Sequence, residues 1–355
     1  MNTEISQLLN NKVSWLADCG PNDDIAISSR IRLARNLRGL PFPTNASPEQ
    51  MKHVIATVET AVQKTSLKDE LLRFDMEAIR AIDKQVLFER RLVSREFIEG
   101  KIPGALLVTG DESLGVMINE EDHIRMQAMR PGFQLGPVWD ELNKLDDELS
   151  ALVPYVFDKE LGFLTSCPTN VGTGIRASVM LHLPGLVLSE QINAVIQGVS
   201  KLGFAVRGIF GEGSKNLGNL FQVSNQSTLG ESEQQIVQQL GSVITQIISH
   251  EKNARRKLLE SNQNFLLNHV GRAYGTLRHA YILNSEEALE SLSALRLGVD
   301  LGMFSSIDLH TVNELFIIIH PAHLQKYAGK EIDSEERDVF RASLVRERLK
   351  NADKR

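Results

Sequence analysis

The sequence contains few cysteines and no long apolar run, and both absences narrow the class of protein. Only Cys19 and Cys167 occur among 355 residues, too few for a disulfide framework. The longest purely apolar run near the C-terminus, 315–319, is far shorter than the ~20 residues that cross a bilayer. The first twenty residues contain a single lysine and no apolar stretch typical of a secretory signal. We therefore expect a cytoplasmic protein that makes no contact with a membrane.

The sequence also has no excess of basic residues over acidic ones. The 39 Lys and Arg residues against 45 Asp and Glu residues give a net charge of −6 at pH 7. Such a chain, with 42% hydrophobic residues, is typical of a globular protein that does not bind nucleic acid by bulk charge. Arginine nevertheless supplies 23 of the 39 basic residues. Because its planar fork suits phosphate and carboxylate, the positions of the arginines indicate what the chain binds.

The hydrophobic pattern divides the chain into a mixed region and a helical region. Apolar alternation and short apolar runs predict strands at 24–33, 104–109, 114–119, 163–167, 177–183, 204–209 and 220–224. Helical spacing predicts helices at 48–63, 120–129, 137–152 and 189–202. From Ser232, which forms a capping-box pattern with Gln235, nearly everything is predicted to be helical. We expect a short helical segment over 1–24, a mixed domain over 25–255 and a helical domain over 256–355.

Two arginines stand two residues apart in the first predicted strand. Residues i and i+2 of a strand face the same side, so Arg30 and Arg32 project together. Neighbouring guanidinium groups repel each other unless an anion lies between them. A clamp for polyphosphate and a solvated edge strand are both consistent with this pattern.

Three acids, Glu120, Glu121 and Asp122, follow the predicted strand 114–119 and precede His123 and Arg125. A carboxylate fixed at the end of a strand suits general-base catalysis. Acids are also typical of the first turn of a helix, because they complement the positive end of its dipole. The sequence leaves both interpretations open.

A cysteine precedes a glycine-rich segment, Cys167-Pro168-Thr169-Asn170-Val171-Gly172-Thr173-Gly174-Ile175-Arg176-Ala177. The segment formally matches G-x-G-x-x-A, but Pro184 follows too soon for the helix of a dinucleotide-binding fold. Cys167 is either a poised thiolate or a small buried hydrophobic residue. Arg176 begins a predicted strand, from which it can meet a phosphate.

Four glycines follow Arg207 within residues 208–218. Such a segment is either a mobile flap that approaches a ligand or a plain hairpin loop, and Glu212 is the acid within it. The sequence contains no P-loop and no protein-kinase motif. The histidines of His320-Pro321-Ala322-His323 lack partners at ligand spacing, so we predict no metal site formed by side chains.

In their order and spacing these four blocks resemble the phosphagen (guanidino) kinase family, over about residues 25–255. The resemblance is greatest to the bacterial protein-arginine kinases of the McsB type, because only about 24 residues precede the first strand and a helical domain follows. In that domain, 337–342 matches the R-D-x-x-R-A motif of these kinases. Spacing alone places Arg337 and Arg341 on one helix face, which is also typical of a charged surface.

The resemblance implies an α+β fold: a largely antiparallel sheet flanked by helices, plus an all-helical C-terminal domain. It implies an ATP-dependent protein-arginine kinase in which Glu121 and Glu212 bind and deprotonate the substrate guanidinium beside Cys167. Arg91 stands where relatives often have histidine. The residues implied to bind ATP are Ser28, Ser29, Arg30, Ile31, Arg32, Arg91, Arg125, Arg176, Ala177, Ser178, Val179, Met180, Arg207, Gly208, Ile209, Phe210, Gly211 and Glu212.

The resemblance also implies Mg²⁺ held mainly by phosphates and water, and a regulatory phosphoarginine bound by Arg337, Asp338, Arg341 and Ala342. The implied partners are proteins with exposed arginines, an activator protein and a Clp-type unfoldase and protease that acts in the stress response. A homodimer or higher homo-oligomer, formed through the C-terminal domain, is implied as well. Two rival hypotheses remain: a kinase of free arginine or another small guanidine, and a phosphoarginine-reading adaptor without turnover.

Overall fold

The computed structural model describes residues 3–11, 13–16, 20–68, 71–208 and 217–352. The chain forms two compact units, and each is assembled from three stretches of sequence. The first unit comprises Met1–Trp15, Ser28–Val179 and Ser224–Ser242; the second comprises Leu16–Ile27, Met180–Val223 and Val243–Arg355. The division expected near residue 255 falls inside an unbroken helix, α8 (Glu233–Ser261).

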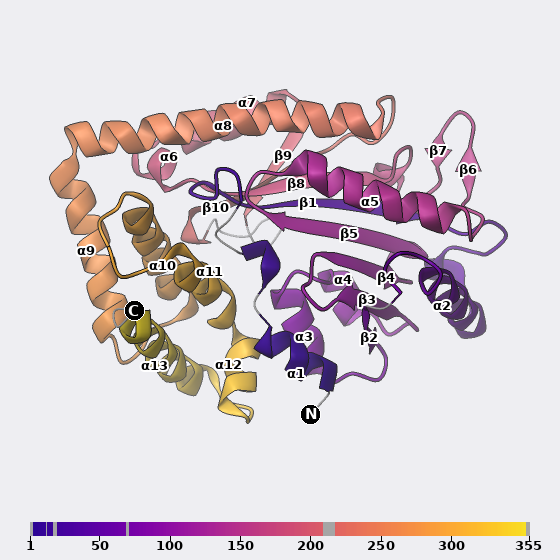
Figure 1. Ribbon diagram of the computed structural model, residues 1–355, viewed down its shortest axis with the longest axis horizontal. Helices are drawn as coiled ribbons and strands as arrows, with labels where there is room; N and C mark the ends of the chain where they lie inside the picture. The colour runs from indigo at the N-terminus through magenta and orange to yellow at the C-terminus, as the bar shows by residue number, and fades with distance from the viewer. Residues whose placement is uncertain (1–2, 12, 17–19, 69–70, 209–216, 353–355) are drawn as a thin grey trace. The chain divides into compact units, whose positions relative to one another are not determined.

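An antiparallel sheet forms the centre of the first unit (Figure 1). Its strands are β1 (Ala26–Arg35), β2 (Leu71–Asp75), β3 (Ala105–Thr109), β4 (Leu114–Ile118), β5 (Ile124–Pro131) and β8 (Ile175–His182), in the order β2-β3-β4-β5-β1-β8. Around the sheet lie α1 (Thr3–Asn10), α2 (Pro48–Val62), α3 (Ala81–Glu89), α4 (Arg95–Glu99) and α5 (Leu135–Ser150). Three 3-10 turns, η1 (Ser14–Leu16), η2 (Pro43–Asn45) and η3 (Pro168–Asn170), and a hairpin of β6 (Phe157–Asp158) and β7 (Gly162–Phe163) belong to the connections.

Side-chain alternation gives this sheet two different faces. One face is covered by α5, which runs along β1 and β5 in Figure 1. Ser29 points to that side, since its hydroxyl accepts a hydrogen bond from the backbone N–H of Gln134, 2.9 Å away, just before α5. Ile31 is fully buried there, and Arg35 binds Asp146 of α5. Arg30 and Arg32 therefore project from the opposite face, as their spacing predicts.

Residues 120–129 do not form a helix, so that prediction is wrong. Their second half is β5, which pairs with both β1 and β4. Acids followed by good helix formers such as Met, Gln and Ala are typical of a helix start, but pairing on both sides outweighs this weak preference. Residues 126–129 are all buried, as expected of a strand with a neighbouring strand on each side, while Arg125 remains partly exposed. The predicted strand 163–167 is likewise reduced to β7, and β2, α3 and α4 were not predicted.

Helices predominate in the second unit. They are α6 (Pro184–Leu188), α7 (Ile192–Lys201), the latter half of α8, α9 (Gln263–His279), α10 (Ser285–Asp300), α11 (Leu309–Ile318), α12 (Pro321–Ala328) and α13 (Ser334–Ala352). Strand β9 (Phe204–Gly208) follows β8 and β10 (Leu220–Asn225) in the order β8-β10-β9, and η4 (Leu217–Asn219) precedes β10. Helix α10 packs against α9, α11 and η4. The helices α9, α10 and α11 lie in the orange and yellow part of Figure 1.

Apolar periodicity predicts the buried face of α13 only in part. Val345 and Leu349 are fully buried as expected, but Val339 is 51% exposed. The buried stripe runs through Arg341, and two residues along a helix rotate a side chain by about 200°. Val339 therefore points to the opposite side of the helix.

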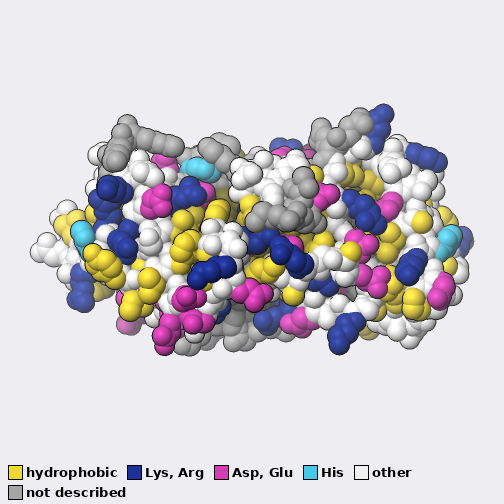
Figure 2. Space-filling view, turned by 90° about the horizontal axis from the view of Figure 1, so that it is seen from below, with side chains coloured by type: hydrophobic (Ala, Val, Ile, Leu, Met, Phe, Trp, Pro, Cys, Tyr) yellow, Lys and Arg dark blue, Asp and Glu magenta, His cyan; other side chains and the backbone are white. Residues whose placement is uncertain are grey.

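The predicted fold class is confirmed: a large antiparallel sheet flanked by helices precedes a helical C-terminal region. The capping box at the start of α8 is also present, since the amide of Gln235 donates to the Ser232 hydroxyl and the Gln235 side chain accepts from the Ser232 amide. No helix in the described ranges is both long and apolar enough to cross a membrane. On the face seen in Figure 2, acidic and basic side chains are interspersed, in keeping with the small net charge.

Candidate active site

Five arginines lie near one another on the face of the sheet opposite α5. In the register of β1 and β5, Arg32 stands opposite Gln127 and Ala34 opposite Arg125, so Arg125 shares the face of Arg30 and Arg32. Arg176 belongs to β8, the neighbour of β1 on its other side. The fifth member, Arg91, lies in the turn after α3. We refer to Arg30, Arg32, Arg91, Arg125 and Arg176 as the arginine cluster.

The charges of the arginine cluster lie close enough to perturb one another. Burial and the positive charges of Arg125 and Arg176 lower the pKa of Arg30 to about 10. Burial lowers the pKa of Arg91 to about 9, and the charge of Arg30 adds to the effect. The pKa of Arg32 is lowered as well, by burial and then by three neighbouring arginines. Shifts of this sign mean that the protein environment disfavours these positive charges, which an anion would reverse.

One atom of the cluster has no partner at all in the described part of the chain. The Nε of Arg32 is buried, and no described group accepts its hydrogen bond. A buried donor without an acceptor costs about 1–3 kcal/mol, so such atoms are rare in proteins. A phosphate oxygen placed between the guanidinium groups supplies the missing acceptor. The residues present therefore fit a polyphosphate ligand.

Gln127 is a functional candidate that the sequence did not reveal. Its side-chain amide donates to the backbone carbonyl of Arg91 at 3.1 Å. Arg91 adopts a positive φ of 62°, which is uncommon for a residue other than glycine, asparagine, aspartate or histidine. Gln127 thus holds a constrained turn that presents Arg91 to the face of Arg32. A strand prediction over 124–131 would have placed Gln127, two residues after Arg125, on the same face of the sheet.

The turn between β4 and β5 is rigid and sets the positions of the acids. The amide of Asn119 donates to the carbonyl of His123 at 3.0 Å, and Asn119 has a φ of 57°. Asp122 is fully buried, where its Oδ1 accepts from the Asn36 side chain and the Ser166 amide, both at 2.7 Å. His123 accepts from the Leu37 amide through Nδ1, and burial lowers its pKa. Asp122 and His123 are thereby occupied in holding the loops together.

Glu120 and Glu121 have different environments although they are adjacent. Glu120 is 8% exposed, and it accepts hydrogen bonds from the Ser94 hydroxyl at 2.5 Å and from Arg125 Nη1 at 2.6 Å. The side chain of Glu121 is 37% exposed, and its Oε2 lies 3.8 Å from Arg125. Burial raises the pKa of Glu121, while the Arg125 charge and a hydrogen bond with Cys167 act against that rise. Of the two, Glu121 is the carboxylate that can receive a substrate.

Cys167 lies at the start of η3, and its thiol is near both Glu121 and a hydroxyl. Its Sγ is 3.0 Å from Oγ1 of Thr169, and the residue is partly exposed. Behind it, Gly172 and Gly174 have φ angles of 112° and 65°. A Cβ atom would lie 2.2 Å from the Thr228 carbonyl at Gly172 and 2.6 Å from the Ala34 carbonyl at Gly174. Gly174 is therefore required for close backbone packing against β1, and Gly172 for close packing against the backbone of Thr228.

The remaining residues expected to bind ATP are spread over different environments. Ser29 and Ile31 belong to the α5 face, and strand alternation separates Ala177 and Val179 from Arg176 and Ser178. Ser28 shares the face of Arg30, and Met180 lies where β8 enters the second unit. Arg207 and Gly208 end β9 of the second unit. Ile209, Phe210, Gly211 and Glu212 lie outside the described residues.

The C-terminal motif forms a separate cluster in the second unit. Arg341 is buried, and its guanidinium donates to the carbonyls of Leu283 at 2.7 Å and Ile319 at 3.0 Å. It also donates to Oδ1 of Asp338 at 2.5 Å, while burial lowers the pKa of Arg341. Asp338 and Arg337 remain partly exposed, and Arg337 donates to the Ile332 carbonyl at 3.1 Å. Ala342 is buried beneath them.

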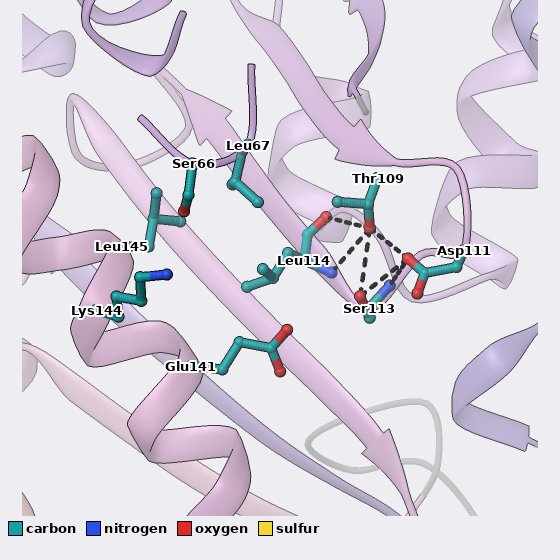
Figure 3. Close-up of a pocket in the computed structure, with 9 residues that line it drawn as sticks. All are labelled: Ser66, Leu67, Thr109, Asp111, Ser113, Leu114, Glu141, Lys144 and Leu145. Atoms are coloured by element: carbon teal, nitrogen blue, oxygen red, sulfur yellow. Dashed lines mark hydrogen bonds between the residues drawn. The ribbon is translucent and has the colours of Figure 1, made fainter. Parts of the chain in front are cut away.

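A polar pocket of about 280 Å³ lies on the α5 side of the first unit (Figure 3). Thr109, Asp111 and Ser113 at the β3–β4 turn bond to one another, as the dashed lines show. Across the pocket, Glu141 of α5 accepts from Arg130 at 2.9 Å. The side chains of Thr109, Asp111, Ser113 and Glu141 already have partners, so this pocket is a poorer candidate than the arginine cluster. Within the described ranges, no group of three His, Cys, Asp or Glu side chains is arranged to hold a metal ion.

Comparison with known proteins gives the relationships of the chain. The family model for the ATP:guanido phosphotransferase C-terminal catalytic domain matches residues 52–254, and the model for the protein-arginine kinase McsB C-terminal domain matches residues 263–355. The protein-arginine kinase of Halalkalibacterium halodurans is 46% identical over 342 residues, 96% of each chain. That of Geobacillus stearothermophilus is 46% identical over 349 residues, 97% of this chain and 96% of its own. A solved lombricine kinase has the same fold, with a TM-score of 0.60 and 22% identity over 71% of both chains.

Proposed function

Since the chain belongs to the ATP:guanido phosphotransferase family, and within it to the protein-arginine kinases, we propose that its arginine cluster binds the phosphates of ATP while Glu121 binds the guanidinium group. The enzyme transfers a phosphoryl group from ATP to arginine side chains of proteins. The observation that carries the site assignment is the unsatisfied Nε of Arg32 among like charges. Phosphoryl transfer depends mainly on positioning and on neutralising the charge of the transferred group, and arginines supply both.

The acceptor nitrogen needs help from a base. A guanidinium ion has no free lone pair and a pKa above 12, so a nitrogen attacks only as it loses a proton. In the proposed step, an N–P bond forms, the bond between the γ-phosphorus and the bridging oxygen breaks, ADP leaves, and the proton passes to Glu121. The raised pKa of Glu121 suits this role, since it increases the affinity of the carboxylate for that proton.

Mg²⁺ would accompany ATP, coordinated by phosphate oxygens and water, and would neutralise part of their charge. On the family relationship, we propose Glu212 as the second carboxylate that binds the substrate guanidinium. Arg207 would contact the same nucleotide, and Cys167 would lie next to the reacting nitrogen, where it holds Glu121 in place. Arg91 would contact the nucleotide from the turn fixed by Gln127.

Replacing Glu121 by Gln tests the assignment. The neutral amide cannot take the proton, so we expect kcat for an unfolded protein substrate to fall by about 10³-fold, while ATP affinity stays unchanged. Glu141→Gln on the α5 face is the matched control and should retain full activity, since Glu141 pairs with Arg130 away from the cluster. Full activity of Glu121→Gln would contradict the assignment. Supplying free arginine in place of the unfolded protein separates protein phosphorylation from a small-guanidine kinase.

We also propose that Asp338 and Arg337 form the exposed part of a phosphoarginine site, with the acid binding the guanidinium and the arginine binding the phosphate. Their partial exposure supports this, as does the match to the C-terminal domain of protein-arginine kinases. Titration of the full-length protein with free phosphoarginine in a calorimeter should give saturable binding that Asp338→Asn abolishes. Absence of heat with the wild type would refute the site.

The biological setting is proposed on the family relationship alone. We propose that the enzyme acts in the cytoplasm as a homo-oligomer, under the control of an activator protein. Phosphorylated substrates would pass to a Clp-type unfoldase and protease during stress.

A further inference from the structure

A group of buried charged side chains lies in the second unit, outside every role described above. Arg255 of α8 and Arg296 of α10 are 5% and 0% exposed, and both donate to Oδ2 of Asp300, at 3.3 and 3.1 Å. Glu251 accepts from Nε of Arg255 at 2.7 Å. Two positive and two negative charges therefore balance within the protein. We refer to Glu251, Arg255, Arg296 and Asp300 as the buried arginine network.

The network holds the start of β1. Nη2 of Arg296 donates to the carbonyl of Asp23 at 2.5 Å, and its Nη1 donates to the carbonyl of Asp24 at 2.8 Å. Arg255 reaches the same Asp24 carbonyl at 3.2 Å. β1 begins at Ala26 and continues to the arginines of the cluster. The guanidinium groups of Arg255 and Arg296 thus fix the backbone that leads into β1.

The network also holds the end of β8. His182, the last residue of that strand, is fully buried, with Nδ1 at 3.1 Å from Arg296 Nη1 and Nε2 at 2.8 Å from the Ser293 hydroxyl. Because a guanidinium only donates, Nδ1 accepts and Nε2 carries the proton. Burial and the two arginines hold the pKa of His182 well below its ordinary value, so the ring stays a neutral acceptor. Arg255 donates to the carbonyl of His182 at 3.2 Å.

Two helices link the network to the C-terminal motif. Nε of Arg296 donates to Asn313 of α11 at 3.0 Å, and the carbonyl of Ile319, directly after α11, accepts from Arg341. Arg341 also binds the carbonyl of Leu283, just before α10, which itself carries Arg296. The 16 residues of α10 span about 24 Å. Each helix is therefore held by Arg341 at one point and by Arg296 at another.

We propose that Arg296 is a positioning residue for the kinase reaction: by holding the ends of β1 and β8 it fixes the strands that carry Arg30, Arg32 and Arg176. Through α10 and α11 it also transmits changes at Arg341 to these strands. This second part rests on the proposed phosphoarginine site. Asp338 accepts from Arg341, so a ligand guanidinium that competes for Asp338 alters the contacts of Arg341 with both helices. Binding of phosphoarginine and of ATP are then coupled, and the coupling is reciprocal.

The test uses the full-length enzyme and the variant Arg296→Lys. Lysine keeps a positive charge beside Asp300 but lacks the planar fork that reaches both carbonyls. We expect KM for ATP to rise about tenfold with kcat nearly unchanged, because the variant still performs the chemical step once ATP is bound. Arg256→Lys is the matched control, since Arg256 is the exposed neighbour of Arg255 and binds only Asn253 among the contacts described. A wild-type KM in folded Arg296→Lys, or an equal rise in the control, overturns the proposal.

Free phosphoarginine supplies the second arm of the experiment. In the wild type it should change KM for ATP, and in Arg296→Lys this change should disappear. If phosphoarginine binds in the calorimeter but leaves KM of the wild type unchanged, the coupling is refuted; if it does not bind, the proposed phosphoarginine site is refuted. The KM of Arg296→Lys decides the positioning role in either case. Should Arg296→Lys fail to fold, Asn313→Ala replaces it in the same assay. That variant removes the acceptor of Nε together with the hydrogen bond that the Asn313 side chain donates to the Leu16 carbonyl at 3.3 Å. We expect a rise in KM of about threefold; an unchanged KM overturns the proposal.

Discussion

The arginine cluster of the first unit and the buried arginine network of the second differ in what neutralises their charge. In the network, Asp300 and Glu251 lie within 3.3 Å of the guanidinium groups of Arg255 and Arg296. In the cluster, Glu120 binds Arg125. Burial lowers the pKa of both Arg30 and Arg296, but the charges of other arginines add to the lowering at Arg30, whereas the charge of Asp300 acts against it at Arg296. Both sets are largely desolvated, so burial alone does not distinguish them. The neighbouring charges do: acids lie beside the network arginines, whereas the cluster arginines are those that we propose to bind the phosphates of ATP.

Removing a cluster arginine should give the largest effect and should act on activity alone. For Arg32→Met we expect kcat/KM to fall about 10³-fold, because one of the groups that neutralise the transferred phosphoryl is lost. The free energy of unfolding should stay equal or rise, since a buried positive charge near three others has been removed. Urea denaturation and steady-state kinetics measure the two quantities. Arg130→Met, which alters the α5 face, is the control. A marked loss of stability in Arg32→Met would contradict the expectation that the cluster arginines do not stabilise the fold.

Removing a network arginine should act mainly on stability. Arg255→Met leaves Glu251 buried without its cation, and breaking one side of a buried ion pair costs about 3 kcal/mol. The midpoint of urea denaturation should fall accordingly. Adding Glu251→Gln should restore part of the loss, because the side-chain amide carries no charge. Its one carbonyl oxygen can still accept from one of the two backbone amides, Gly185 or Leu186, that now bind separate carboxylate oxygens. A loss no greater than that of Arg256→Met would contradict the structural role.

The smallest expected effect concerns Glu121, the acid beside the arginine cluster, and the pH dependence of kcat/KM. The pKa of Glu121 is raised by burial, and the carboxylate must be ionised to bind a guanidinium, so kcat/KM should decline as pH falls through that raised pKa. The hydrogen bond with Cys167 favours the charged form. Cys167→Ala should therefore move the acid limb of the pH profile to higher pH, with a loss of about fivefold at acidic pH for a bond of about 1 kcal/mol.

Cys167→Ser keeps a donor at this position and should resemble the wild type more closely. A displacement of the acid limb to lower pH in Cys167→Ala would show that the thiol does not stabilise the Glu121 carboxylate. That outcome would mean that Cys167 acts only as a small packing residue, as many free cysteines do.

The sequence predicts local features of the site well where alternation is clear. Alternation predicts Arg30 and Arg32 on one side of a strand, and β1 places them so. The segment after β4 misleads such a prediction because its acids and its Met, Gln and Ala residues are typical of a helix. Only the pairing of β5 with strands on both sides decides its conformation, and such pairing depends on residues far away in the sequence. The role of Gln127 is hidden in the sequence for the same reason.

The sequence contains no sign of the network, because its members are widely separated. Arg296 binds His182 and the carbonyl of Asp24, 114 and 272 residues away. Spacing likewise makes a charged surface a possible interpretation of Arg341, whereas Arg341 is buried and bound to two carbonyls. A buried arginine of this kind looks the same as a surface arginine in a sequence pattern. Its partners become apparent only when the chain is folded.

The contact between Arg296 and the backbone of Asp23 has a consequence for folding during synthesis on the ribosome. The two residues lie 273 positions apart. At roughly 5–20 residues per second, the ribosome completes Arg296 only about 15–50 s after Asp23 has been made. Closing so long a loop is slow and must await most of the polypeptide. The strand that leads to Arg30 and Arg32 thus receives its final anchor late, so a nascent chain should bind ATP poorly until synthesis is nearly finished.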